Sequence, residues 1–161
     1  LVSVVGFPLG YNLTETKIIE TEQLIKMGAD EIDVVWSLTA FKAGMNWPKI
    51  ELAKLSQLCH EQERILKVIL ETAYLSDSEI VQACEICADA GVDYVKTSTG
   101  FAPEGAKEKH IKLMRENLPS TVGIKASGGI KTLEQALGLI QAGADRIGTS
   151  SGVQIVKSAM E

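Results

Sequence analysis

The same short turn occurs three times in this sequence, at Gly28-Ala29-Asp30, Gly91-Val92-Asp93 and Gly143-Ala144-Asp145. Each copy ends a segment of helical periodicity and leads directly into a short apolar run of strand type. Strand and helix alternate six times, and the strands are continuously apolar, as strands buried on both faces are. Because similar units share one entry turn, the pattern favours a rotationally repeated (β/α) barrel over an open doubly wound sheet. The chain also lacks the G-x-G-x-x-G fingerprint of a dinucleotide fold.

The boundaries of the expected elements follow from apolar runs, glycine stops and helix caps. Thr14 and Thr132 are expected N-caps, and Ser76 with Glu79 forms the capping-box pattern. Residues 1–161 are expected to form one barrel domain with its own core. Strands are expected at 1–7, 31–36, 65–71, around 96, 121–126 and 146–150. Helices are expected at 14–27, after Pro48, at 77–90, 104–117 and 133–143, and after Gly152.

The composition is that of an ordinary globular protein, with 45% hydrophobic and 23% charged residues. The net charge of −5 argues against a nucleic-acid partner, because no basic field is available to displace counterions from phosphates. No apolar run is long enough to span a membrane. Cys84 and Cys87 form a C-x-x-C pair, which invites a redox or zinc site. Their i, i+3 spacing on an expected helix, with no second pair, indicates buried core residues instead.

The repeated turn also predicts which strand residues face the same way. The fifth residue after each terminal glycine is Asp33, Lys96 or Gly148. If the three turns are alike, these residues share a side and a height, because side chains alternate along a strand. Lys67 and Lys125 add one ionisable group each to two further strands. The alternative is that these lysines point outward between the helices. Four ionisable residues on neighbouring strands are better explained by a site inside the barrel.

These side chains suit chemistry that begins with an amine nucleophile. A drier environment and a second ammonium, here Lys125, both lower the pKa of Lys96. Asp33 is expected to hold the two lysines together and to relay protons through a water molecule. An amine with such neighbours forms an imine with a carbonyl compound. Making or breaking a carbon–carbon bond beside that imine is class I aldolase chemistry.

Two Gly/Ser turns follow the last two expected strands, at Ser127-Gly128-Gly129 and at Gly148-Thr149-Ser150-Ser151-Gly152. Each opens onto a helix, where backbone amides and hydroxyls are suited to hold a phosphate. Barrels commonly place their phosphate site in these last two loops. The pattern therefore favours a small phosphorylated substrate.

Six stretches carry a recognisable pattern: VVGFPLG at 4–10, GADEIDVV at 28–35, LKVILET at 66–72, VKTSTGF at 95–101, IKASGGIKT at 124–132 and RIGTSSG at 146–152. In this order and spacing they resemble the deoxyribose-phosphate aldolase family along essentially the whole chain. The resemblance implies an eight-stranded TIM barrel that cleaves 2-deoxy-D-ribose 5-phosphate to acetaldehyde and D-glyceraldehyde 3-phosphate, reversibly. It also implies a cytoplasmic enzyme of deoxynucleoside breakdown that needs no metal or organic cofactor.

The resemblance assigns roles to individual residues. It places the imine-forming lysine on Lys96 and the proton-relay partners on Asp33 and Lys125. It places phosphate contacts on Gly128, Gly129, Ser150 and Ser151. We also expect Lys67, Thr99 and Gly148 to contact the substrate.

The sequence departs from the family in two respects. Only six strand–helix units are visible, and the two units that precede VVGFPLG in the family are missing. We therefore expect an N-terminally incomplete barrel, or one completed by another chain, and a homo-oligomer is a further option. Phe101 stands where some relatives have a phosphate-binding lysine, so Lys131 or backbone amides must contribute more to phosphate binding.

The alternatives differ in function rather than in fold. One is another Schiff-base barrel aldolase or synthase acting on a phosphorylated sugar. The other is a barrel fragment without catalytic activity.

Overall fold

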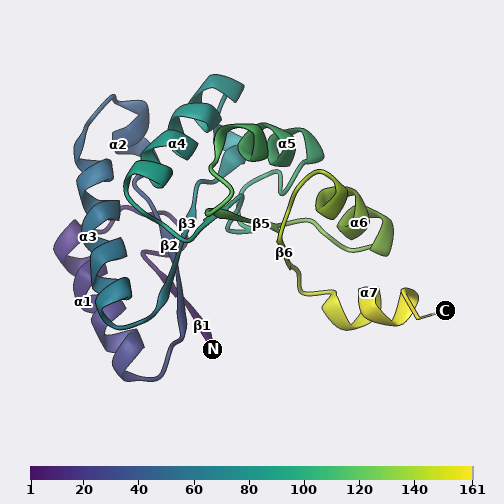
Figure 1. Cartoon of the computed structure of the whole chain (residues 1–161), viewed down its shortest axis with the longest axis horizontal. Coiled ribbons are helices and arrows are strands. Elements are labelled where there is room, and N and C mark those ends of the chain that lie inside the picture. Colours follow the sequence, from purple (N-terminus) through teal and green to yellow (C-terminus); the bar gives the residue numbers. More distant parts are fainter. Residues whose placement is uncertain (161) are drawn as a thin grey trace.

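The computed structural model describes residues 1–160, which form a curved sheet of six parallel strands covered by helices on its outer face (Figure 1). The strands pair in sequence order: β1 (Val2–Val5), β2 (Glu31–Val35), β3 (Ile65–Ile69), β4 (Tyr94–Lys96), β5 (Gly123–Ser127) and β6 (Arg146–Gly148). The helices are α1 (Thr14–Lys26), α2 (Leu38–Lys42), α3 (Trp47–Glu61), η1 (Thr72–Tyr74), α4 (Asp77–Asp89), α5 (Glu108–Asn117), α6 (Leu133–Gln141) and α7 (Gly152–Ser158).

The sheet is a half-barrel rather than a closed one. Figure 1 shows the helices following one another in an arc, from α1 and α3 to α6 and α7. Within the described residues β1 and β6 are the two edges and do not pair with each other. The parallel α/β architecture predicted from the sequence is therefore confirmed. None of the helices in residues 1–160 is long and apolar enough to cross a membrane.

Two of the three predicted helix caps are confirmed. Ser76 and Glu79 form a reciprocal capping box at α4, and Thr132 forms one with Gln135 at α6. The prediction for Thr14 is wrong, because Leu13 is the N-cap of α1 and Thr14 is already helical. The Thr14 hydroxyl instead donates a hydrogen bond of 2.8 Å to a carboxylate on α3.

Some element boundaries also differ from those expected. The short elements α2 and η1 were not predicted, and the predicted strands are longer than those observed. Helix α5 begins at Glu108 rather than near residue 104. The preceding chain is held on the end of β5, where the Ala106 amide donates to the carbonyls of Ser127 and Gly128 at 3.1 Å each. A Cβ on Gly105 would lie 2.0 Å from the Gly128 carbonyl oxygen, so this close approach requires glycine.

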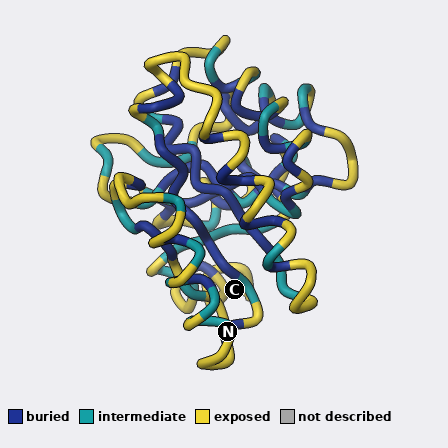
Figure 2. The backbone as a smooth tube through the Cα atoms, turned by 90° about the vertical axis from the view of Figure 1, so that its left-hand side faces the viewer, coloured by how far each residue is buried: buried dark blue, intermediate teal, exposed yellow. Residues whose placement is uncertain are grey.

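The apolar core lies between the sheet and the helices. Every second residue of the central strands faces this layer and is fully buried, including Ile32, Leu66, Val95 and Ile124. Figure 2 shows buried segments running through the middle of the molecule, with exposed segments around them. Cys84 and Cys87 on α4 belong to this core, and burial raises the pKa of the Cys84 thiol to about 12.

The other strand residues face the inside of the half-barrel and are staggered as in a closed barrel. In the hydrogen-bonded ladder Asp33 is level with Tyr94, and Lys96 is level with Arg146. Lys96 lies two residues beyond Tyr94, and Gly148 lies two beyond Arg146. The rise is thus one residue per strand, which is the stagger of an eight-stranded barrel with a shear of eight. Asp33, Lys96 and Gly148 therefore share a height along the barrel axis.

Candidate active site

Three lysines converge on one carboxylate inside the half-barrel. The Asp33 carboxylate accepts hydrogen bonds from Lys67 Nζ at 2.9 Å on Oδ1, and from Lys96 Nζ and Lys125 Nζ at 2.8 Å each on Oδ2. Asp33 is 1% exposed, and Lys96 is 8% exposed. The alternative in which the lysines point outward between helices is wrong, because all three point inward. The structure thus brings together the four ionisable residues that the sequence singled out.

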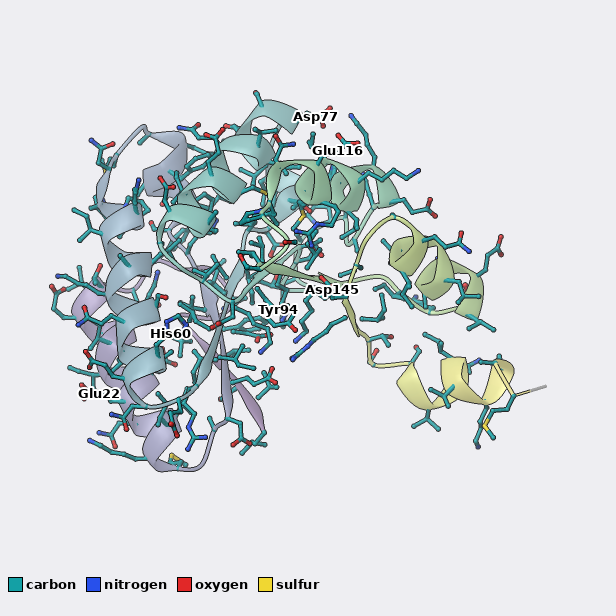
Figure 3. The ribbon with its side chains drawn as sticks, viewed as in Figure 1. Glu22, His60, Asp77, Tyr94, Glu116 and Asp145 are labelled. Atoms are coloured by element: carbon teal, nitrogen blue, oxygen red, sulfur yellow. The ribbon has the colours of Figure 1, made fainter. Side chains whose placement is uncertain are left out.

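A second layer of charge lies below this cluster, toward the amino ends of the strands. Lys67 also pairs with Glu31, and Glu31 accepts a 2.7 Å hydrogen bond from Arg146. The Arg146 guanidinium lies 4.4 Å from the ring centre of Tyr94. Figure 3 shows Tyr94 on the inner side of the strands, whereas labelled residues such as Glu22 and Glu116 lie on the outer helices. Opposite charges therefore alternate from the base of the sheet to its mouth.

Lys67 is placed differently from the prediction that it contacts substrate. Its side chain is fully buried, and both of its partners are carboxylates of the neighbouring strand β2. It does not line the cavity beside Lys96. Its position under Asp33 instead fixes that carboxylate from below.

The surroundings shift the pKa values of the two central groups. Burial alone would raise the pKa of Asp33, but the hydrogen bonds from Lys125 and Lys96 lower it to about 2. Burial is the main cause that lowers the pKa of Lys96, and the positive charges of Lys125 and Lys67 lower it further. Asp33 opposes this by stabilising the ammonium form. Both causes expected from the sequence, a drier environment and the Lys125 ammonium, therefore lower the pKa of Lys96, and loss of water has the larger effect.

Lys96 and Lys125 open onto a cavity of about 350 Å³. The cavity lies at the carboxyl ends of β4, β5 and β6, where barrel enzymes carry their sites. Apart from Lys67, six residues were predicted to contact the substrate or its phosphate. Five of them line this cavity, namely Thr99, Gly128, Gly129, Gly148 and Ser150, and Ser151 does not.

Glycine is favoured at three positions of this wall. A Cβ on Gly148 would lie 3.2 Å from Lys125 Cε, so a side chain there would crowd the amine. Gly128 and Gly129 both adopt left-handed backbone angles, with φ of 87° and 75°. The Thr149 hydroxyl donates 2.6 Å to the Ile130 carbonyl and so ties together the two loops that follow β5 and β6. Lys131 also lines the cavity beside these loops.

Glu71 was given no role from the sequence and Ser127 was expected only in a phosphate-binding turn, yet both hold the loop after Lys96. The Glu71 carboxylate accepts the backbone amide of Thr99, and the Ser127 hydroxyl donates 2.7 Å to the Ser98 carbonyl. Glu71 is 7% exposed although it carries a carboxylate. A signal for Glu71 was present, because it is an acidic residue directly after an apolar strand and shares the parity of Lys67.

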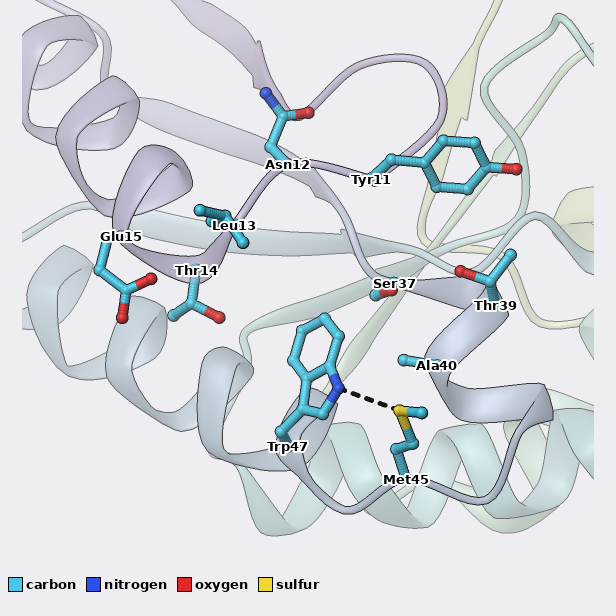
Figure 4. A pocket seen from close by; sticks show the side chains of 10 residues that line it. All are labelled: Tyr11, Asn12, Leu13, Thr14, Glu15, Ser37, Thr39, Ala40, Met45 and Trp47. Carbon is cyan, nitrogen blue, oxygen red and sulfur yellow. Dashed lines mark hydrogen bonds between the residues drawn. The ribbon is translucent and has the colours of Figure 1, made fainter.

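A larger cavity lies elsewhere and has a different character. It has a volume of about 470 Å³ and lies between the loop before α1 and the segment from α2 to α3 (Figure 4). Trp47 and Met45 form one wall, with the indole Nε1 3.3 Å from the Met45 sulfur. Glu15 is its sole ionisable side chain besides the Tyr11 phenol. With no amine, it offers no group for imine chemistry. Residues 1–160 also contain no cluster of histidine, cysteine or carboxylate side chains suited to a metal ion.

Comparison with known proteins agrees with this geometry. Residues 3–158 match the sequence pattern of the DeoC/LacD family of aldolases. Deoxyribose-phosphate aldolases of Thermococcus gammatolerans and Thermococcus kodakarensis are 47% and 48% identical over 160 residues, covering 99% of this chain and 71% of each relative.

Solved structures agree with the sequence matches. An aldolase named QR15 superposes with a TM-score of 0.94 at 44% identity, covering 99% of this chain and 72% of that one. The tetrameric deoxyribose phosphate aldolase of Aeropyrum pernix superposes with a TM-score of 0.91 at 35% identity, covering 100% and 68%. With its converging lysines, its half-barrel and these relatives, the chain belongs to the DeoC/LacD family of aldolases.

Proposed function

We propose that this protein cleaves 2-deoxy-D-ribose 5-phosphate to acetaldehyde and D-glyceraldehyde 3-phosphate, reversibly, through an imine on Lys96. The observation that carries the proposal is the Lys96 amine itself. It has a lowered pKa, lies 2.8 Å from Asp33 and faces a cavity of about 350 Å³. The relatives named deoxyribose-phosphate aldolase support the choice of substrate.

The reaction needs the neutral amine and a route for protons. Lys96 attacks the aldehyde carbon of the open-chain sugar, and loss of water gives a protonated imine. This electron sink allows the bond between C2 and C3 to break while the C3 hydroxyl gives up its proton. The resulting enamine takes a proton at C2, and hydrolysis then releases acetaldehyde. Asp33 is ionised at neutral pH because its pKa is about 2, so it orients and relays rather than acting as the acid.

Lys125 is suited to supply and recover these protons. It shares the oxygen Oδ2 of Asp33 with Lys96, at 2.8 Å from each amine. A proton therefore passes between the two amines by way of one carboxylate oxygen or a water molecule beside it. The proposed catalytic residues are accordingly Lys96, Lys125 and Asp33.

The phosphate is proposed to bind in the loops after β5 and β6. Gly128, Gly129, Ser150 and Ser151 supply backbone amides and hydroxyls there, as the family resemblance implies. Phe101 cannot contribute a charge; its ring is 76% exposed and packs edge-on against Phe7 at 5.5 Å. The interior also holds more cations than carboxylates, which favours an anionic ligand. The interior charges are Lys67, Lys96, Lys125 and Arg146 against Glu31, Asp33 and Glu71.

We also propose that residues 1–161 are one domain of an eight-stranded barrel. Two further strand–helix units would fill the gap in the barrel wall between the edge strands β6 and β1. The stagger of one residue per strand and the unpaired edges support this closure. The cytoplasmic location and the absence of a nucleic-acid partner stay proposals from the family resemblance and the net charge of −5. Association of several copies is a proposal for which the tetrameric relative is the support.

Imine trapping tests the central step. The protein is treated with acetaldehyde and borohydride, digested, and mapped by mass spectrometry for the reduced adduct. We expect labelling of Lys96 and loss of labelling in Lys96→Arg, with Lys131→Arg as the control because that lysine also lines the cavity. An adduct confined to Lys125 would exchange the roles of the two lysines. No adduct at either residue would refute catalysis by this chain.

A further inference from the structure

Glu71 has an unusual backbone conformation at the end of β3. Its φ of 59° and ψ of 62° lie in the left-handed region that side chains other than glycine rarely adopt. Among residues 1–160, Glu63 is the one other non-glycine residue with positive φ, at 54°. Glu63 is exposed in the turn before β3, whereas Glu71 is buried. The left-handed turn at Glu71 therefore directs a carboxylate into the protein.

The buried Glu71 carboxylate forms its hydrogen bonds with one residue of the neighbouring loop, Thr99. Both Glu71 oxygens accept the Thr99 amide at 3.3 Å, and Oε2 also accepts the Thr99 hydroxyl. Within the described part of the chain Glu71 forms no ion pair with lysine, arginine or histidine. An acid that is buried without a cation depends on such hydrogen bonds.

The backbone on either side of Glu71 contacts the same loop. The Leu70 amide donates 2.9 Å to the Lys96 carbonyl, and the Thr72 amide donates 2.9 Å to the Thr97 carbonyl. With the side-chain contact to Thr99, the end of β3 thus holds three positions from Lys96 onward. This arrangement continues the pairing of β3 with β4 past the last ladder residue.

The end of β5 holds the same loop from the other side. The Thr97 hydroxyl donates 3.0 Å to the Ser127 carbonyl, and the Ser127 hydroxyl donates 2.7 Å to the Ser98 carbonyl. The turn from Thr97 to Gly100 is therefore held between two strand ends. Glu71 supplies the charged contact on the β3 side.

Thr99 connects this arrangement to the reaction cavity. It lines the cavity beside Lys96, and together with Glu71 it lines a smaller cavity of about 90 Å³. Its hydroxyl proton is directed to Glu71, and its oxygen accepts the Phe101 amide at 3.1 Å. The Thr99 hydroxyl is thus an anchor of the turn, not a free donor to the substrate.

We propose that Glu71 is a positioning residue, whose inward carboxylate anchors the Thr97–Gly100 turn through Thr99 and so fixes Lys96 for attack on the carbonyl. This inference rests on the proposed role of Lys96. Small displacements of a nucleophile lower the rate of the chemical step more than they weaken binding.

Four variants test the proposal. Glu71→Gly keeps the left-handed backbone and removes the carboxylate, whereas Glu71→Gln keeps the shape and one acceptor oxygen. Thr99→Val removes the hydroxyl at nearly constant shape. Glu63→Gly is the matched control, because it relieves the other left-handed residue at an exposed site away from Lys96.

We expect kcat of Glu71→Gly to fall by roughly 10- to 100-fold with KM changed by less than about threefold. The kcat of Glu71→Gln should lie between those of Glu71→Gly and the parent, and the kcat of Glu63→Gly should stay within about twofold of the parent value. Thr99→Val should lose as much as Glu71→Gln, and combining those two should cost no more than the worse single change, because both break one contact. Borohydride trapping of Lys96 should slow in the same order.

Hydrogen exchange separates this inference from the proposed reaction. The peptide spanning residues 97–101 should exchange at least about tenfold faster in Glu71→Gly than in the parent, with melting temperatures compared in parallel. Unchanged exchange in both Glu71 variants would overturn the anchoring role even if activity fell. An unchanged kcat in the Glu71 variants would overturn the positioning role. So would additive losses of kcat on combining Glu71→Gln with Thr99→Val, or losses of kcat that follow the melting temperature alone. A parent protein that forms no Lys96 adduct would refute the reaction, while exchange would still decide whether Glu71 holds the turn.

Discussion

Replacing Asp33 by asparagine removes the charge shared by three lysines. Asparagine has nearly the same shape and keeps one acceptor oxygen, so the change acts mainly on electrostatics. In the parent, Lys67, Lys96 and Lys125 all lie within 2.9 Å of the Asp33 carboxylate. Without it, three neighbouring amines have no common counter-charge at this height of the barrel.

The size of the effect follows from the pKa of Asp33. The pKa falls from an ordinary value of 3.8 to about 2 in the folded protein, where hydrogen bonds from Lys125 and Lys96 outweigh the opposing effect of burial. This difference corresponds to about 2–3 kcal/mol of stability. Because the folded pKa is the lower one, the contribution is fully present above about pH 5 and is lost as the pH falls through about 2.

Urea unfolding followed by tryptophan fluorescence measures this contribution across pH. At pH 7 we expect the free energy of unfolding of Asp33→Asn to be lower than the parent value by at least about 2 kcal/mol. Between pH 5 and 2 the variant should lose less stability than the parent. Asp89→Asn is the control, because Asp89 pairs with Lys49 at 2.7 Å on the surface and such pairs contribute about 0–1 kcal/mol. Equal stability of Asp33→Asn and the parent at pH 7, or parallel pH curves, would refute the reasoning.

Two further predictions concern other buried contacts. Lys17→Met should lower the free energy of unfolding by about 3–5 kcal/mol, because it leaves Glu51 buried without its 2.6 Å partner. In urea unfolding, the double variant Lys17→Met with Glu51→Met should recover most of this loss of stability. Gly148→Ala should lower kcat by roughly tenfold, because its Cβ would lie 3.2 Å from Lys125 Cε, and unchanged steady-state kinetics would contradict this crowding.

The sequence was informative about the fold wherever a local rule governs the structure. The capping boxes at Ser76 and Thr132 depend on residues three apart, and both are present. Thr14 failed as a cap because its hydroxyl bonds to Glu51, which is distant in sequence. Helix α3 shows the same dependence on a partner that is distant in sequence. Ile50 is 57% exposed, whereas Glu51 is buried against Lys17.

The site was predictable to the extent that strand parity determines it. Counting from the repeated glycines correctly placed Asp33 and Lys96 on one side, since alternation along a strand is geometric. Depth along the barrel was not available from parity, so Lys67 was assigned to the substrate although it lies beneath Asp33. The role of Glu71 depends on a left-handed backbone angle, which no rule of composition predicts for glutamate.

Alternate residues of the same strands carry separate tasks in this half-barrel. Val95 packs against the helices with no exposed surface, and its neighbour Lys96 faces the cavity at the carboxyl ends of the strands. The same division holds for Ile124 and Lys125 on β5. Evolution can therefore exchange the inward set to obtain a new reaction while the outward set continues to hold sheet and helices together. An insertion or deletion of one residue within β4 would instead interchange the two sets, and both cohesion and catalysis would be lost at once.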